Sequence, residues 1–406
     1  MSPDASLPPE PSSTLLEALS AAVAIAAKAR SVEEGLFFQI LTLRDAPDQA
    51  LPELRALLAA VKSVPHLEIF DTAEQDSLGQ SHQVDHLFLV RWLVSRGQQV
   101  GAESAVSDLN RYLQTDRLDL VEVLAVDGFS CPLPVSAGGF EIVPWQSVPM
   151  SDTKWRVLVR QVFSWPDPSS ALLRKHTVSK VHFRPWDLRQ PTIPLSLEPA
   201  IDVLRCITAV SGAGVRRLHY WVEPPDWAPW ATSASDFAVD ASAHSMHVEL
   251  TSSDIEQAKA CTTRMSEMEE PLRQRLRVPL DRLNRSILAG FRTVDAAIEL
   301  GIALESLYAP KKLTDGIAFA LRARAARFLG GTLEERRRTY ATVNDIYDLR
   351  SLAVHAGRFD VQGAKKKWRD STQVIQAIRD GQALTGLSLA KVIQEGEPDW
   401  EEIDIA

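Results

Sequence analysis

The sequence has 406 residues, of which 45% are hydrophobic and 24% are charged, and its formal net charge is −9. This composition is typical of a soluble globular protein with enough chain for two or three domains. Three widely separated cysteines exclude a disulfide framework and a cysteine-based metal cluster, which predicts a reducing compartment. The first residues lack the basic region of a signal peptide, and the longest apolar stretch, 18–27, is too short to span a bilayer. We therefore expect a cytoplasmic protein without membrane contact.

Residues 1–13 are predicted to form a disordered tail, and residues 14–118 a mainly helical region. A serine or threonine cap precedes the apolar run in SSTLLEAL, and PELRALLAAVKSV repeats apolar residues at steps of three and four. His82 and His86 are four residues apart, a spacing that could hold a metal if a third ligand came from elsewhere. Neither an HExxH motif nor a cysteine lies nearby, so we favour a plain helix or loop and predict no metal site.

Residues 119–250 are predicted to form an α+β domain built on an antiparallel sheet. Short runs rich in β-branched and aromatic residues, such as VEVLAVDGF and WRVLVRQVF, are separated by Gly, Pro, Asp and Ser clusters. One helical stretch, EPAIDVLRCITAVSGAG, interrupts them and ends at a glycine. Seven of the ten tryptophans lie between Trp145 and Trp230, most densely in WVEPPDWAPW. These rings either form a recognition surface or fill the edge of the sheet, and we favour the second.

Residues 251–394 are predicted to be helical, with helices near 253–268, 278–308, 313–329, 333–356 and 369–394. From residue 281 to residue 394 there are 19 basic and 12 acidic residues, whereas the rest of the chain has 25 basic and 41 acidic residues. A basic module on an acidic chain is typical of a domain that faces nucleic acid; the alternative is chance unevenness of solvated helix faces. The acidic tail, 395–406, is expected to be solvated and disordered. The alternative is that it docks on a basic surface and competes with nucleic acid.

The segment YDLRSLAVHAG, residues 347–357, contains an arginine and a histidine five positions apart, Arg350 and His355. That spacing alone is uninformative, because a chain with 32 arginines and nine histidines is expected to contain such a pair by chance. On a helix with ~100° per residue, one face gathers the apolar side chains of Ile346, Leu349, Leu352, Ala353 and Ala356. The opposite face gathers Asn344, Asp348, Ser351 and His355, with Arg350 at the border. We therefore expect His355 to face solvent or a partner chain.

Three segments in this region resemble the HEPN superfamily of helical domains, and in particular its Apea-like branch. They are ALESL with Glu305, RARAARFLG with Arg324 and Arg327, and the helix from Tyr347 to His355 with RSLAVH. The resemblance covers roughly the last third of the chain. It implies an α+β multidomain protein in which a helical N-terminal region and a central sheet domain, as sensor or regulator, precede an all-α HEPN-like bundle.

The resemblance also implies a metal-independent endoribonuclease that works as a homodimer, needs no cofactor and serves prokaryotic antiphage defence. Its partners would be an RNA substrate, a second copy of the chain, and a phage-derived trigger or another defence protein. Arg350 and His355 of two protomers would line one cleft, supported by Ser351, Asp348, Glu305 and Tyr347. Histidine suits the proton transfers of 2′-hydroxyl attack, and arginine suits the charge of the phosphorane.

Ser351 and Ala356 depart from the residues that active HEPN nucleases often have, which leaves a second hypothesis open. In this alternative, a non-catalytic HEPN module binds RNA or a nucleotide, or serves as a dimerisation scaffold. Glu305 lies in an apolar helix and is expected to pair with Arg324 or Arg327 as a structural ion pair, the alternative being a role in the site. Residues that either follow the RNA backbone or form solvated faces are Arg324, Arg327, Arg336, Arg337, Arg338, Lys365, Lys366 and Lys367.

Overall fold

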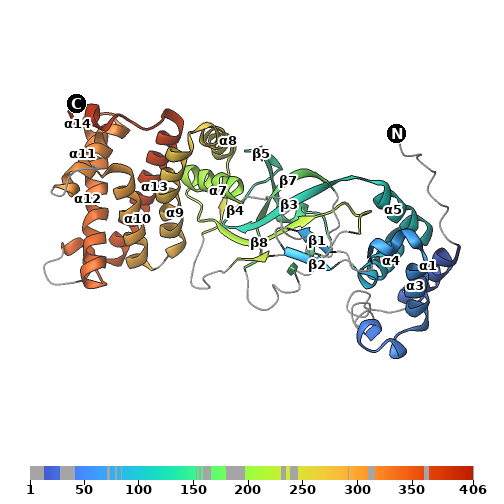
Figure 1. Ribbon diagram of the computed structural model, residues 1–406. Helices are drawn as coiled ribbons and strands as arrows, with labels where there is room; N and C mark the ends of the chain where they lie inside the picture. Colours follow the sequence, from blue (N-terminus) through green and yellow to red (C-terminus); the bar gives the residue numbers. More distant parts are fainter. Residues whose placement is uncertain are drawn as a thin grey trace, which may run out of the picture. The chain divides into compact units, whose positions relative to one another are not determined.

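The structure is a computed structural model, and the chain forms two compact units (Figure 1). The structure describes residues 13–27, 42–70, 74–77, 80–83, 85–151, 153–154, 157–158, 166–179, 197–229, 235–237, 246–290, 292–309, 316–360 and 365–405. The first unit comprises Met1–Glu122, Lys175–Leu195 and Trp221–Ala234, and the second comprises Val123–Arg174, Ser196–Tyr220 and Ser235–Ala406. The predicted α+β region, 119–250, is therefore divided between the two units.

The first unit has a helical core with a small hairpin. Its helices are α1 (Ser13–Ala26), α3 (Pro52–Ser63), α4 (His86–Val100) and α5 (Ala102–Gln114), with short 3-10 turns at Pro47–Gln49 and Pro65–Phe70. Leu19, Leu57 and Leu93 are fully buried where α1, α3 and α4 meet. Gly97 allows this approach, because a Cβ there would lie 2.6 Å from Val23 Cγ2.

His82 and His86 do not share a helix. His82 lies on β2 (Gln80–Gln83), which pairs antiparallel with β1 (Glu74–Ser77), whereas His86 begins α4 after the capping residue Asp85. The imidazole Nε2 of His86 lies 3.0 Å from the carbonyl oxygen of Leu67. Within the described ranges, no group of three His, Cys, Asp or Glu residues is placed to hold a metal ion.

The main sheet has six strands in the order β5-β6-β7-β3-β8-β9. They are β3 (Arg117–Asp127), β5 (Val135–Ala137), β6 (Phe140–Pro144), β7 (Ser170–Ser179), β8 (Arg216–Glu223) and β9 (Ser235–Asp236). β6 is antiparallel to both β5 and β7, and β9 is antiparallel to β8, as the sequence predicts. A separate pair, β4 (Phe129–Ser130) and β10 (Val248–Glu249), is parallel.

The tryptophans that the structure describes in this region serve packing. Trp221 is fully buried and donates from Nε1 to Glu223 Oε2 at 2.8 Å, and the guanidinium of Arg111 lies 4.1 Å from the ring centre of Trp227. Trp145, which opens a 3-10 turn (Trp145–Ser147), is also buried. Trp155, Trp165, Trp186 and Trp230 lie outside the described residues.

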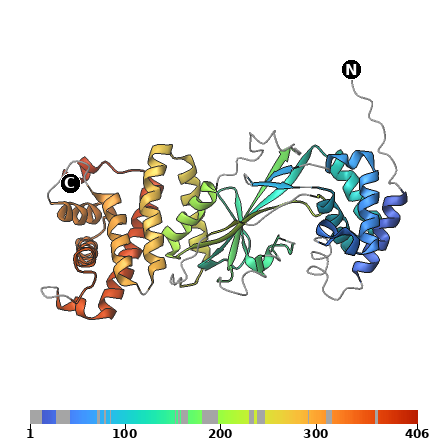
Figure 2. The ribbon, with the colours of Figure 1, turned by 60° about the horizontal axis from the view of Figure 1, so that its bottom comes forward.

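The second unit carries the helices of the C-terminal half, together with α7 (Glu198–Ser211). The others are α8 (Ser252–Glu267), α9 (Glu270–Ala289), α10 (Thr293–Tyr308), α11 (Ile317–Leu329), α12 (Leu333–Ala356), α13 (Ser371–Glu395) and α14 (Trp400–Ile405), with a 3-10 turn at Lys366–Arg369. In Figures 1 and 2, α9, α10 and α13 lie side by side. At Gly381 of α13, a Cβ would lie 2.6 Å from Ile346 and 2.7 Å from Leu300, so this glycine lets α10, α12 and α13 meet closely.

Two sequence expectations for these helices need correction. The predicted helix 278–308 is interrupted, because Gly290 adopts φ +55° between α9 and α10. The tail is not fully disordered, because residues 400–405 form α14. Its Trp400 packs edge-on against Tyr308, with the ring centres 5.6 Å apart. None of the described helices is both long and apolar enough to cross a membrane.

Candidate functional site

Arg350 lies where α12 crosses α10. The crossing point on α10 is Gly301, where a Cβ would lie 2.5 Å from Arg350 Cγ and 2.9 Å from Arg350 Cβ. The aliphatic part of the arginine therefore passes directly over the backbone of α10. Its Nη2 donates to Glu305 Oε2 at 3.3 Å, and the two side chains are 29% and 28% exposed. The Arg350 Nε is buried and has no hydrogen-bond partner among the described residues.

Glu305 therefore pairs with Arg350, and the expected pairing with Arg324 or Arg327 is wrong. Gly301 and Glu305 are four residues apart and share one face of α10, so the packing that admits the stem of Arg350 also places its guanidinium at the carboxylate. With both groups partly exposed, such a pair stabilises the fold by at most ~1 kcal/mol. Its main effect is to hold the arginine in one orientation.

His355 is exposed in the last turn of α12, just before Gly357 ends the helix at φ +66°. It makes no hydrogen bond or ion pair with the residues that the structure describes. Five residues separate it from Arg350, which corresponds to about 7.5 Å along the helix and roughly 140° around it. The two side chains of one protomer therefore diverge.

The apolar and polar faces of α12 largely follow the helical wheel. The buried residues are Val343, Ile346, Leu349 and Ala353. Ser351 and Tyr347 are partly buried, and Tyr347 packs at the edge of the core. Ala356, expected in the core, is exposed because the helix leaves the bundle in its last turn, where Val354 is also 51% exposed.

Asp348 belongs to a chain of polar contacts across three segments. Arg322 of α11 donates to Asn344 Oδ1, Asn344 Nδ2 donates to Asp348 Oδ2 at 3.3 Å, and Lys365 donates to the same carboxylate. Asp348 is consequently engaged with a cation of its own chain. This chain of contacts fixes α12 against α11 and the segment before α13.

The other predicted RNA-binding lysines and arginines differ in their surroundings. Lys367 donates to both carboxylate oxygens of Asp345 at 2.6 Å, whereas the side chain of Lys366 lies outside the described residues. Exposed arginines in the first turns of α12 are Arg336, Arg337 and Arg338. The N-terminus of this helix is closed by a capping box between Thr332 and Glu335. The three arginines that follow it are exposed to solvent.

Arg324 and Arg327 lie on the face of α11 that α14 covers. Arg324 is buried, donates to Asp404 from Nε and Nη2, and donates to the carbonyl oxygen of Tyr308 from Nη1. Arg327 donates to the carbonyl oxygens of Ile403 and Asp404. The acidic tail therefore docks, through α14, on the two arginines of α11.

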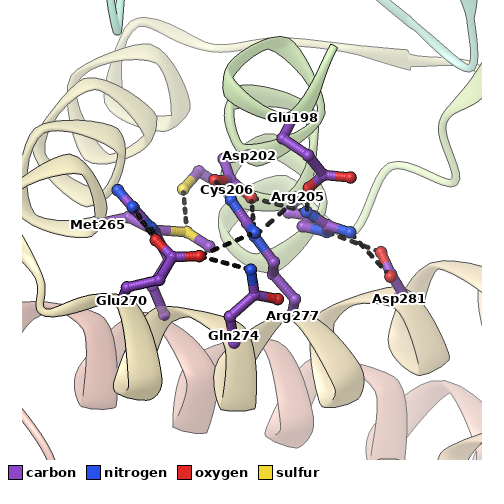
Figure 3. A network of polar contacts seen from close by, with 10 residues as sticks. Glu198, Asp202, Arg205, Cys206, Met265, Glu270, Gln274, Arg277 and Asp281 are labelled. Atoms are coloured by element: carbon purple, nitrogen blue, oxygen red, sulfur yellow. Dashed lines mark hydrogen bonds and ion pairs between the residues drawn. The ribbon is translucent and has the colours of Figure 1, made fainter. Parts of the chain in front are cut away.

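Sequence reasoning missed a second charged cluster, between α7 and α9 (Figure 3). Arg205 donates to Asp281, Asp202 and Glu198, and Arg277 donates to Asp202 at 3.0 and 2.7 Å. Burial lowers the pKa of Arg205, but the hydrogen bonds with these carboxylates outweigh it and raise that pKa. The spacing of Glu198, Asp202 and Arg205 along one helix face is the signal that could have revealed it.

This cluster fastens α7 to α9. Clefts of about 300 and 460 Å³ flank it, lined by Glu198 and by residues of both helices. Because the buried arginines are matched by carboxylates of the neighbouring helix, the cluster is satisfied within the unit itself.

Comparisons with known proteins identify no relative of this chain. No model of a known protein family matches the chain, and no curated protein or solved structure matches it. A functional proposal therefore rests on the resemblance of three segments to HEPN domains, on the Arg350–Glu305 contact and on the exposure of His355.

Proposed function

We propose that the helices of residues 252–395 form a HEPN-like domain that dimerises and cleaves RNA without a metal ion. The observation that carries the proposal is the placement of His355, which is exposed and lies roughly 140° around α12 from Arg350. A histidine buried in its own bundle could not reach a substrate. Because the two side chains of one chain diverge, a second copy would supply the missing half of the site, with Arg350 and His355 of two protomers in one cleft.

In the proposed reaction the RNA supplies its own nucleophile. The 2′-hydroxyl oxygen forms a bond to phosphorus while the bond from phosphorus to the 5′-oxygen breaks, leaving a 2′,3′-cyclic phosphate and a 5′-hydroxyl. One His355 accepts the 2′-hydroxyl proton and the other donates a proton to the 5′-oxygen. Arg350 stabilises the extra negative charge on the phosphorane with the terminal Nη–H groups that Glu305 does not use.

Glu305 acts as a positioning residue in this scheme. Its carboxylate accepts from Nη2 of Arg350 at 3.3 Å, and Nε of Arg350 is buried, so this guanidinium would meet a phosphate through its terminal Nη groups. Ser351 and Asp348 lie on the same side of α12 as His355 and support the polar surface of the cleft. The N-terminal unit and the sheet would sense a phage-derived trigger or restrain the nuclease in antiphage defence.

One observation favours the alternative, a non-catalytic module that binds RNA or a nucleotide or serves as a dimerisation scaffold. The carboxylate of Glu305 offsets part of the positive charge of Arg350, and the pair is self-contained within one chain. In that case the protein would bind without turnover, and replacement of His355 would leave binding at the wild-type level.

RNA cleavage in EDTA tests the proposal. We expect the wild-type protein to cut single-stranded RNA and leave 2′,3′-cyclic phosphate ends, and we expect His355→Ala and Arg350→Ala to abolish cutting while sedimentation still shows a dimer. His66→Ala is the matched control, because His66 is an exposed histidine of the other unit. Cutting that EDTA stops, or full activity in both variants, would contradict the nuclease. RNA binding without any cutting would favour the alternative.

A further inference from the structure

The face of α11 that carries Arg324 and Arg327 is occupied by the last helix of the chain (Figure 1). Trp400, the first residue of α14, packs against the rings of Tyr308 and Phe328, at 5.6 and 5.8 Å between ring centres. The guanidinium of Arg324 lies 5.2 Å from the centre of the indole ring. α14 is thus held by one aromatic anchor at its start and by two arginines at its end.

The contacts at the end of α14 are those that arginine also makes with phosphate. Arg324 forks onto Asp404, with Nε to Oδ1 at 2.8 Å and Nη2 to Oδ2 at 2.5 Å. The same paired N–H groups bind two oxygens of a phosphate in the same geometry. Arg327 donates from Nη1 to the carbonyl oxygens of Ile403 and Asp404 at 2.9 and 2.7 Å, where the partial negative charge of the helix end lies.

α14 has little stability of its own. It has six residues, too few for a helix to persist in water without tertiary contacts. Glu401 and Glu402 are exposed and form no side-chain hydrogen bond or ion pair with other described residues, and Asp404 is 42% exposed. The segment before α14 is held by an ion pair between Glu397 and Arg275, whose side chains are 37% and 42% exposed. To leave α11, α14 must give up the ring contacts of Trp400 and the hydrogen bonds with Arg324 and Arg327, and a phosphate could replace the latter.

We propose that the Arg324–Arg327 face of α11 binds RNA phosphate, and that α14 covers this face in cis as an acidic competitor. This inference rests on the proposed function in one respect, that RNA is the macromolecule bound. The segment from Glu397 to Asp404 places its negative charges on the domain that has an excess of basic residues. A polyanion that displaces Asp404 would meet a guanidinium already held in place by the carbonyl of Tyr308.

Hydrogen exchange on the unaltered full-length protein tests displacement directly. Backbone amides of residues 403–405 should lose protection when a single-stranded 2′-O-methyl oligoadenylate, which has no free 2′-hydroxyl and therefore cannot be cut, is added at saturating concentration. An acidic peptide without phosphate, such as oligoglutamate, should have a much smaller effect. Unchanged protection with RNA bound would overturn the proposal, and so would release by oligoglutamate but not by RNA, which would indicate a protein partner.

A pair of charge-matched variants tests competition. Asp404→Asn and Glu401→Gln each remove one negative charge from α14, but only Asp404 contacts Arg324. In a His355→Ala background, Asp404→Asn should lower the Kd for oligoadenylate by about fivefold or more, as for a typical coupling between two binding events. Glu401→Gln should change it much less. Equal effects of the two variants, or weaker binding by Asp404→Asn, would overturn the proposal.

The outcomes separate this inference from the proposed nuclease. If RNA displaces α14 but the wild-type protein does not cut RNA, the proposal of a phosphate-binding surface under α14 is supported and the proposal of a nuclease is contradicted. If the protein cuts RNA in a His355-dependent manner while the amides of α14 stay protected, the nuclease proposal is supported and the proposal of a phosphate-binding surface under α14 is contradicted. The exchange measurement uses the unaltered chain, so it decides the matter even if Asp404→Asn does not fold.

Discussion

Gly301 of α10 lies directly beneath Arg350 of α12: a Cβ at position 301 would lie 2.5 Å from the Arg350 Cγ. The glycine has no role in a turn, because it lies inside a 16-residue helix. Its missing side chain is what allows α12 to bring an arginine onto the backbone of α10 and within reach of Glu305. Any larger residue at this position must move either the arginine or the helix.

Gly301→Ala is therefore expected to destabilise the protein even though alanine is the better helix former. Helix propensity alone would stabilise the variant by about 1 kcal/mol, whereas overpacking of a tight contact costs about 1–3 kcal/mol. Urea unfolding gives the net change. Ser306→Ala, an exposed substitution on the same helix, should stay within ~0.5 kcal/mol of wild type. A Gly301→Ala variant more stable than wild type would show that Arg350 can move away from position 301 at little cost in free energy.

A composite cleft predicts complementation between two inactive variants. Arg350→Ala and His355→Ala should each lack RNA cleavage alone, and mixing them by denaturation and refolding should restore a small part of it, because the mixed dimer has one histidine for the two proton transfers. Roughly half of the dimers would then be mixed, and each mixed cleft would contain one arginine and one histidine. Native mass spectrometry verifies that mixed dimers form. Mixed dimers without activity would show that one arginine and one histidine from different protomers do not form a working cleft.

Docking of α14 should weaken in acid. The hydrogen bonds from Arg324 hold the pKa of Asp404 below its ordinary value of 3.8. A carboxylate with a depressed pKa stabilises the folded state above its unfolded pKa, and this stabilisation is lost as pH falls through the folded pKa. The difference in unfolding free energy between wild type and Asp404→Asn should therefore be largest above pH 3.8 and shrink below it. A difference that does not vary with pH would contradict the ion pair.

The charged cluster between α7 and α9 predicts a large effect from one carboxylate. Asp202 accepts from both Arg205 and Arg277, and these three side chains are only 9–12% exposed. Asp202→Asn should leave two nearly buried guanidinium groups undercompensated and cost about 3 kcal/mol or more. Glu198→Gln, at a carboxylate that is 46% exposed, should cost less than ~1 kcal/mol. Urea unfolding compares the two, and equal costs would show that burial does not set the effect.

Local signals were sufficient for most helices of the C-terminal half. The caps at Thr251 and Thr332 and the apolar period of α12 act over three or four residues, so they are visible in the sequence. The break at Gly290 was missed because the apolar pattern continues on both sides of it. Composition indicated strands β3, β6 and β8, but the stretch WRVLVRQVF, predicted as a strand, is helical at residues 157–158, and the β1–β2 hairpin was not predicted. The division of the strands between two compact units depends on contacts between distant segments.

By itself, the sequence determined most of the long helices, which face of α12 is apolar, and that His355 points away from the core, because each depends on the period of one helix. Only the tertiary structure decided which charges meet. Glu305 meets Arg350 rather than Arg324 because Gly301 lets α12 approach α10 closely, and Arg324 meets Asp404 because α14 packs its Trp400 against Tyr308 and Phe328. Ion pairing follows distances of a few ångströms between elements, and those distances are set by packing at small residues and aromatic rings far apart in the chain.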